Sequence, residues 1–309
     1  MNALDAVPTI TQPESAKAGR CPMRVRPTPY LFLLPTVGML LAFSLIPLVY
    51  GFWMSLQHID IVQGTKKFIG FGNYFNLVHD STFGLSLVNT AGYTLAVVPS
   101  ILVCSVVIAI FLHKSTPARL FARVGFYIPF VLSPVVVATS WKWLLNEDLG
   151  VVDGFLKWAG LTAVPWLTDA TAARVAVVVT SVWNLTGFYM LMVLAGLTQI
   201  NEDLYDAAKI AGANGWQRFW HITLPMLRPT LLLIMVLATI HATQAFETIL
   251  LLTDGGPADA TKLVVQNMYN SAFARLDPGY GAAQMVFLLP IVLVIAWLQM
   301  RLFREEKII

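Results

Sequence analysis

Long apolar runs separated by short polar connections dominate the pattern of this chain. The runs lie at about 30–54, 84–112, 124–145, 175–198, 229–252 and 282–303. Each has about the 20 mostly apolar residues that a helix needs to cross the ~30 Å hydrocarbon core of a bilayer. They are too long and too continuous to be strands of a membrane barrel. The pattern therefore predicts an all-α polytopic membrane protein with six transmembrane helices.

The amino-acid composition excludes a soluble fold of this size. Of the 309 residues, 57% are hydrophobic and 12% are charged, whereas soluble domains contain about 25% charged residues. So few charged side chains cannot cover the surface of a soluble protein. Residues 1–29 are the exception, because they are rich in proline and small polar residues. We predict a disordered tail over 1–29 and one transmembrane domain over 30–309.

Lys and Arg residues are distributed unequally between the two sets of connections. Thirteen of the 20 lie in the N-terminal tail, in the second and fourth connections and at the C-terminal end. Cytoplasmic segments of membrane proteins carry the excess of basic residues, so we expect both termini to be cytoplasmic. The basic residues are scattered along the membrane edges and do not form the basic face that nucleic-acid binding needs. We therefore expect the lipid bilayer, and no nucleic acid, as a partner.

The fourth connection, over residues 201–225, is the most informative polar segment. Asn201 is a good N-cap residue, and Gly212 stands where a left-handed residue ends a helix. A second short amphipathic helix is predicted over about 216–222, with Pro225 ending it and Pro229 opening the fifth span. Two interpretations are open at this point. The segment is either an interfacial helix that lies on the lipid headgroups or a docking helix for a cytoplasmic partner.

Three groups of residues in this connection resemble a known signature. They are Asp206-Ala207-Ala208, then Gly212 after three residues, then Ile222-x-Leu224-Pro225 after nine more. The pattern is similar to the cytoplasmic EAA signature of ABC importer permeases, with Asp206 in place of the usual glutamate. YLFLLP at 30–35 and LLTDGGPADAT at 251–261 also resemble the carbohydrate branch of that family, the maltose-type and glycerol-3-phosphate-type permeases. The resemblance covers about residues 30–300.

The resemblance implies a type I ABC importer permease fold and a division of labour between subunits. The chain has no phosphate-binding loop of the form G-x-x-x-x-G-K-[ST], so ATP–Mg is expected on a separate ATPase and no cofactor on this chain. The implied partners are a homologous second permease, two ATPase subunits and an extracytoplasmic solute-binding protein, at a bacterial-type inner membrane. The residues implied in coupling to the ATPase are Asp206, Ala207, Ala208, Gly212, Ala213, Trp216, Phe219, Ile222, Leu224 and Pro225.

Polar side chains inside the predicted spans are candidates for a solute path. At about 100° per residue, His241, Gln244, Glu247 and Thr248 fall within an arc of about 120° of one helix. The other candidates are Asn184 and Phe188 in the fourth span and Asn89 in the second. Such residues either contact a sugar or form hydrogen bonds between helices. Glu247 would disfavour an anionic solute close by, unless His241 or the partner permease supplies positive charge.

Two other functions compete with transport. A membrane-embedded enzyme would use His241 and Glu247 as acid and base, and a membrane scaffold would dock a cytoplasmic partner. The spacing His241-x-x-Gln244-x-x-Glu247 is not the metal-binding H-E-x-x-H pattern. We therefore predict neither a catalytic residue nor a metal site, and expect a permease subunit over residues 30–309.

Overall fold

A computed structural model describes the backbone of residues 28–304 and the side chains of residues 32–301. The predicted disordered tail lies outside the described residues except for Thr28 and Pro29, with which the first helix begins. Residues 28–48 belong to a unit of their own. It comprises helix α1 (Thr28–Leu40), the π-helical turn η1 (Leu41–Leu45) and the start of α2 (Ile46–Ser55). The first predicted span is therefore helical over its whole length.

Residues from Val49 onward form the second unit, which is mainly helical. Its helices are α3 (Gly72–His79), α4 (Ser81–Leu112), α5 (Pro117–Val131), α6 (Pro134–Leu144), α7 (Val151–Trp158), α8 (Ala170–Thr198), α9 (Glu202–Ile210), α10 (Gly215–Arg218), α11 (Leu224–Thr243), α12 (Glu247–Thr253), α13 (Val264–Tyr269) and α14 (Pro278–Arg304). Two π-helical turns, η2 (Phe219–Thr223) and η3 (Asn270–Ala274), interrupt this order. The strands β1 (Gln57–Asp60) and β2 (Thr65–Phe68) pair antiparallel as a hairpin.

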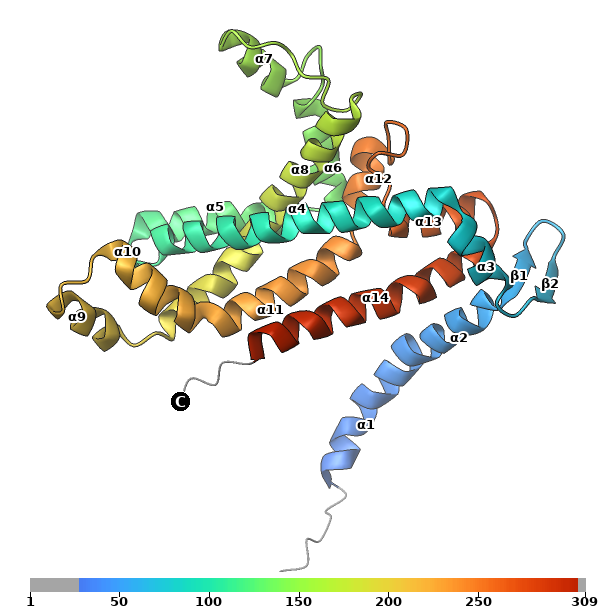
Figure 1. Ribbon diagram of the computed structural model, residues 1–309, viewed down its shortest axis with the longest axis horizontal. Coiled ribbons are helices and arrows are strands. Elements are labelled where there is room, and N and C mark those ends of the chain that lie inside the picture. The colour runs from blue at the N-terminus through green and yellow to red at the C-terminus, as the bar shows by residue number, and fades with distance from the viewer. Residues whose placement is uncertain (1–27, 305–309) are drawn as a thin grey trace, which may run out of the picture. The chain divides into compact units, whose positions relative to one another are not determined.

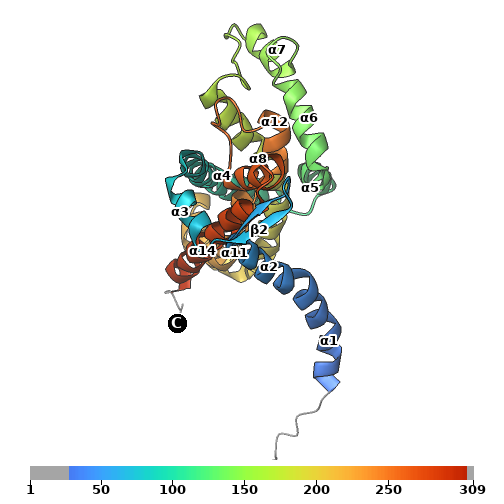
Figure 2. The same cartoon turned by 90° about the vertical axis from the view of Figure 1, so that its right-hand side faces the viewer.

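The core of this unit lies between α4, α8 and α11, with α5 packed on α8 and α14 packed on α11 (Figures 1 and 2). Val97 of α4, Tyr189 and Met190 of α8 and Ile234 of α11 are fully buried there. The long helices bury only part of their apolar surface, and Leu95 and Val103 of α4 stay exposed. Exposed apolar residues on a long helix are expected where lipid, and not water, surrounds it.

The number of spans agrees with the sequence prediction. Five helical stretches of the described residues are long and apolar enough to cross a membrane: Phe32–Ser55, Ser81–Leu112, Ala170–Thr198, Gly215–Thr243 and Pro278–Arg301. The bent pair α5 and α6 makes a sixth if it counts as one span. The helices begin a few residues before the predicted ones, because polar residues such as Asp80 and Asp169 cap them.

The third predicted span, 124–145, is not one continuous helix. α5 ends at Val131, α6 begins at Pro134, and the two helices are bent by 99°. Ser133 has an extended ψ of 137°, as expected for a residue before proline, whose ring disfavours the helical conformation there. Ser133-Pro134 is therefore the physical reason for the break.

The fifth predicted span, 229–252, is also wrong in its bounds. The helical stretch starts at Gly215, runs through Pro225 and Pro229 without ending, and stops at Thr243. Pro225 lies just after the π-helical turn η2, inside the continuous helical stretch; it does not end a separate helix over 216–222. A break at residues 244–246 then separates α11 from α12. His241 and Glu247 therefore do not share one helix.

Small elements that the apolar pattern did not predict shape the other end of the bundle. The β1–β2 hairpin and α3 lie at the end of α4 opposite to α9 and α10 (Figure 1). Asn73 holds the hairpin by donating to the carbonyls of Ser55 and Gln57, at 2.8 and 2.9 Å. Burial alone would raise the pKa of the Asp80 carboxyl, but hydrogen bonds from Tyr280 and from the backbone of Thr82 lower it on balance.

The connection between α4 and α5 lies beside α9. His113 and Lys114 line one pocket together with Tyr205 and Asp206. Arg123 of α5 caps the carbonyl end of α4 by donating to Leu112 O at 2.6 Å. The second and fourth connections therefore share one end of the bundle, as alternating spans require.

Candidate functional site

The helix α9 in the fourth connection has capping groups at both ends. The Asn201 side chain accepts a hydrogen bond from Asp203 N at 3.0 Å, and Glu202 and Asp203 place negative charge in the first turn. At the other end, Gly212 has φ +80° and its N–H bonds to Lys209 O. Ala213 N–H bonds to Ala208 O, which completes a Schellman motif. The left-handed Gly212 predicted from the sequence is confirmed.

A second capping motif begins the next helix, which leads back toward the bundle. Asn214 and Gln217 each accept a hydrogen bond from the backbone N–H of the other, the capping box that starts α10. The rings of Trp216, Phe219 and Trp220 contact one another, with Trp216–Trp220 centroids 5.6 Å apart. Phe219 packs against the core whereas Trp216 is 70% exposed.

The residues predicted to couple to an ATPase fall into an exposed and a half-buried group. Exposed are Asp206, Ala207, Gly212 and Trp216, and half-buried are Ala208, Ala213, Phe219, Ile222, Leu224 and Pro225. Within α9 no residue is fully buried, and Ile210 is 89% exposed. Asp206 and Ala207 give α9 an exposed outer face, and Phe219 and Ile222 pack the segment that follows it against the core.

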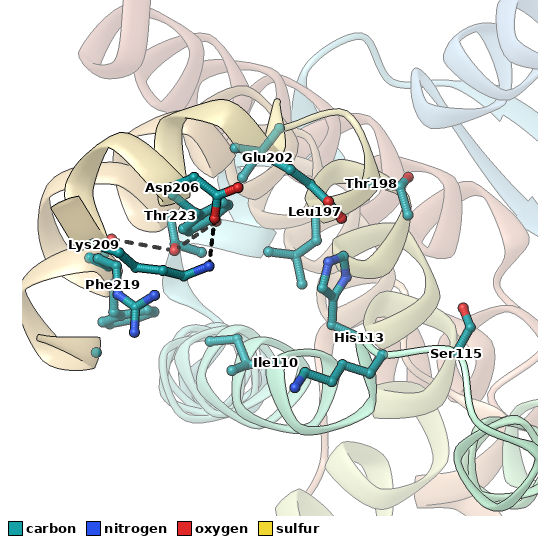
Figure 3. A pocket seen from close by; sticks show the side chains of 15 residues that line it. Ile110, His113, Ser115, Leu197, Thr198, Glu202, Asp206, Lys209, Phe219 and Thr223 are labelled. Carbon is teal, nitrogen blue, oxygen red and sulfur yellow. Dashed lines mark hydrogen bonds and ion pairs between the residues drawn. The ribbon is translucent and has the colours of Figure 1, made fainter.

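A pocket of about 960 Å³ lies behind α9, between the ends of α4 and α8 and the start of α10. Figure 3 shows Asp206, Lys209 and Thr223 on one side of this pocket and His113 and Ser115 on the other. Asp206 and Lys209 form an ion pair at 2.6 Å, but both side chains are more than half exposed, so water screens the pair and it contributes little to stability. The carboxylate of Asp206 is therefore available to a partner.

The candidate path residues of the fifth span lie around the break between α11 and α12. His241 Nδ1 is 2.9 Å from the Tyr189 hydroxyl, and Gln244 is the C-cap residue that follows α11. Glu247 stands in the first turn of α12, where the N-terminal end of a helix favours a carboxylate. His241, Gln244 and Glu247 are all exposed, and Thr248 is half-buried. The break thus replaces the single helical face that the sequence predicted.

The other candidate path residues make contacts within the fold. Asn89 donates to the carbonyls of Asp259 and Lys262, at 2.8 and 3.2 Å, and holds the segment between α12 and α13 against α4. Asn184 donates to Pro129 O at 2.6 Å, next to the bend between α5 and α6. Phe188 stacks on Phe130 with centroids 4.6 Å apart. These contacts favour an interhelical role for both amides.

Two polar partners were not singled out from the sequence as functional. Tyr189 faces His241, and Tyr205 faces Thr223 with 3.0 Å between the hydroxyl oxygens. In the sequence, each of these tyrosines is visible only as a polar side chain inside an apolar or amphipathic stretch. That pattern does not indicate which residue the side chain contacts. Within residues 32–301, no three His, Cys, Asp or Glu side chains are grouped so that they could hold a metal ion.

The chain matches a known family over most of its length. Residues 69–305 match the binding-protein-dependent transport system inner membrane component family. The trehalose/maltose transport system permease protein MalF of Thermococcus litoralis is 33% identical over 282 residues, which cover 90% of this chain and 94% of that protein. The sn-glycerol-3-phosphate transport system permease protein UgpA of Agrobacterium fabrum is 31% identical over 287 residues, 91% of this chain and 95% of that protein.

A solved structure has the same architecture. A chain of a bacterial ABC transporter involved in the import of the acidic polysaccharide alginate superimposes with a TM-score of 0.80 and 25% identity, covering 91% of this chain and 96% of that chain. The capped α9, the spans around it and these similarities agree with one another, and they favour transport over the enzyme hypothesis. The chain belongs to the binding-protein-dependent inner membrane components and is a permease subunit of an ABC importer.

Proposed function

We propose that this permease forms half of the translocation path for a carbohydrate or glycerol-phosphate-type solute. The proposal is supported by the relatives, whose names specify trehalose/maltose and sn-glycerol-3-phosphate, and by the exposed polar side chains at the end of α11. A homologous second permease would supply the other half of the path. The side chain of Glu247 is exposed at this end. Its negative charge disfavours an anionic solute unless a cation of the partner permease or a protonated His241 offsets that charge.

The observation that carries the proposal is the free outer face of α9. α9 is capped at both ends, none of its residues is fully buried, and its outer face is left uncovered for a partner. Leu204, Ala207 and Ile210 leave apolar surface exposed on it, and Asp206 adds a carboxylate. We infer that one of two ATPase subunits receives α9 in a groove. ATP–Mg would bind to the ATPases, and an extracytoplasmic solute-binding protein would deliver the solute.

The orientation follows from the same assignment. If α9 meets an ATPase, its end of the bundle is cytoplasmic, in agreement with the excess of basic residues there. Both termini are then cytoplasmic, and the β1–β2 hairpin and the segment between α12 and α14 are extracytoplasmic.

Cysteine labelling tests this orientation. In a chain whose native cysteines are replaced by serine, Val62→Cys in the hairpin turn and Phe273→Cys in η3 are expected to react with an impermeant maleimide added to intact cells. Both native side chains are well exposed, at 78% and 68%. Gly215→Cys at the start of α10 is expected to react only after the cells are opened. Reaction of position 215 from outside, with positions 62 and 273 protected, would reverse the assigned orientation.

Substitution at the α11–α12 break tests the path. Gln244→Ala and Glu247→Ala are each expected to lower uptake about tenfold, the effect of losing one charge-assisted or two neutral hydrogen bonds to the solute. The ATPases should remain attached, because both residues lie at the other end of α11 from α9. Glu247→Gln separates the charge from the shape of the side chain. Uptake and solute range unchanged in both alanine variants would leave the break with a structural role.

A further inference from the structure

Tyr205 is the residue of α9 whose side chain reaches into the bundle. It is half-buried and packs against the core cluster between α4, α8 and α11. Its neighbours Leu204 and Asp206 are exposed. The two faces of α9 therefore have different surroundings: one is open, and the other is fixed through the Tyr205 ring.

The hydroxyl of Tyr205 makes a directional contact with the next helix. It lies 3.0 Å from Thr223 Oγ1, and Thr223 is 7% exposed. The Thr223 hydroxyl donates to Arg218 O at 3.4 Å. A hydroxyl has one proton to donate, so the Tyr205 hydroxyl is the donor when Thr223 donates to Arg218 O, and otherwise Thr223 can be the donor. This part-buried hydrogen bond fixes both the position and the orientation of the ring.

Thr223 lies at the base of the helix that leads to the candidate path. It is the last residue of the π-helical turn η2, and π-helical turns are frequent at functional sites. The helical stretch continues from there to Thr243 and carries His241 at its other end. The stretch lacks the backbone hydrogen bonds that Pro225 and Pro229 cannot donate, but it stays helical to Thr243, and a helical stretch can carry an axial displacement along its length. A displacement of α9 that is passed on to Thr223 would therefore reach the α11–α12 break.

We propose that Tyr205, through Thr223, is the positioning residue that transmits displacement of α9 to the α11–α12 break, an inference that rests on the proposed docking of α9 to an ATPase. The open face of α9 would receive the force, and the Tyr205–Thr223 hydrogen bond would convert it into movement of α11. Binding of the ATPase and transmission of its movement are thereby assigned to different residues of the same helix.

Conservative variants separate these two roles. Tyr205→Phe keeps the ring and removes its hydroxyl, and Thr223→Val keeps the shape of the side chain and removes the other hydroxyl. Neither changes the open face of α9, so the ATPases should co-purify as with the unchanged chain. In the assembled complex, with native cysteines replaced and Gln244→Cys introduced, the labelling rate of position 244 by an impermeant maleimide is measured with and without ATP–Mg and vanadate.

The nucleotide-dependent change in labelling is expected to fall about fivefold in each single variant, the population shift that corresponds to a hydrogen bond of about 1 kcal/mol. The double variant Tyr205→Phe/Thr223→Val should show no further loss, because both changes remove the same contact. Additive losses would overturn the proposal, since they indicate separate packing roles. So would loss of ATPase co-purification in Tyr205→Phe, which would place the hydroxyl in assembly.

The outcome also distinguishes this inference from the function on which it rests. If position 244 responds to nucleotide in the unchanged chain and equally in both variants, α9 still couples to an ATPase but Tyr205 does not transmit the movement. If position 244 shows no response to nucleotide even in the unchanged chain, the proposed path at the α11–α12 break fails, and this inference fails with it.

Discussion

A Gly212→Val chain is expected to insert into the membrane but to lose its ATPase and all uptake. Gly212 has φ +80°, a conformation that costs a residue with a side chain about 1–3 kcal/mol and a β-branched one the most. No atom lies within 4 Å of the place that a Cβ would take, so the loss cannot come from a clash. The loss comes from the backbone. Without a left-handed residue at position 212 the Schellman motif cannot form, and α9 is no longer held in the position in which the ATPase is proposed to bind it.

Gly212→Asn is the matched control, since asparagine adopts the left-handed conformation far more readily than valine does. It should keep most of the ATPase co-purification and most of the uptake. Equal loss in both variants would show that the position tolerates no side chain at all and that the partner, not the turn, sets the requirement. Normal co-purification with Gly212→Val would remove the coupling role from α9.

A Gly187→Ala substitution is expected to destabilise the bundle by about 3 kcal/mol or more, at the upper end of what overpacking costs. A Cβ at this position would lie 1.9 Å from Phe126 O and 2.6 Å from the carbonyl carbon of the same residue. Both atoms belong to the backbone of α5, so no side-chain rotation relieves the contact. α5 must move away from α8, near the place where Asn184 bonds to Pro129 O. Thermal unfolding of the purified chain measures the effect.

Gly125→Ala on the facing helix is the control for the helix-forming tendency of alanine. Nothing lies within 4 Å of a Cβ built there, so this variant should gain up to about 1 kcal/mol. An unfolding temperature of Gly187→Ala equal to that of the unchanged chain would contradict the close approach of α5 and α8.

The sequence predicted those features that depend on local chemistry. The spans follow from the length of the apolar runs, and the ends of α9 follow from Asn201 and Gly212, because caps are set by residues within one turn. The dipeptide Ser133-Pro134 is a sequence signal for the bend between α5 and α6. The continuous apolar pattern around it led to the prediction of one unbroken span. The break at 244–246 had none of comparable strength, since neither glycine nor proline occurs there.

Contacts between distant residues could not be predicted in the same way. Helical periodicity tells which side chains share a face, but not which partner faces them. Asn184 was placed with the path residues, yet its amide donates to a carbonyl of α5. The sequence does not distinguish Tyr205 from its neighbours, whereas the structure places its hydroxyl beside Thr223. The sequence also could not predict that the candidate path residues lie on two helices. One break in a helix changes the direction in which every later residue points.

Binding-protein-stimulated ATP hydrolysis is the measurement that tests the central claim most directly. Membranes that contain this permease and the proposed second permease are supplied with the proposed ATPases, and hydrolysis is compared with and without the solute-loaded binding protein. We expect strong stimulation with the unchanged chain and none with Gly212→Val, because in the proposed coupling the signal passes through α9. Equal stimulation with both chains would contradict the account and leave α9 as a helix on the membrane surface.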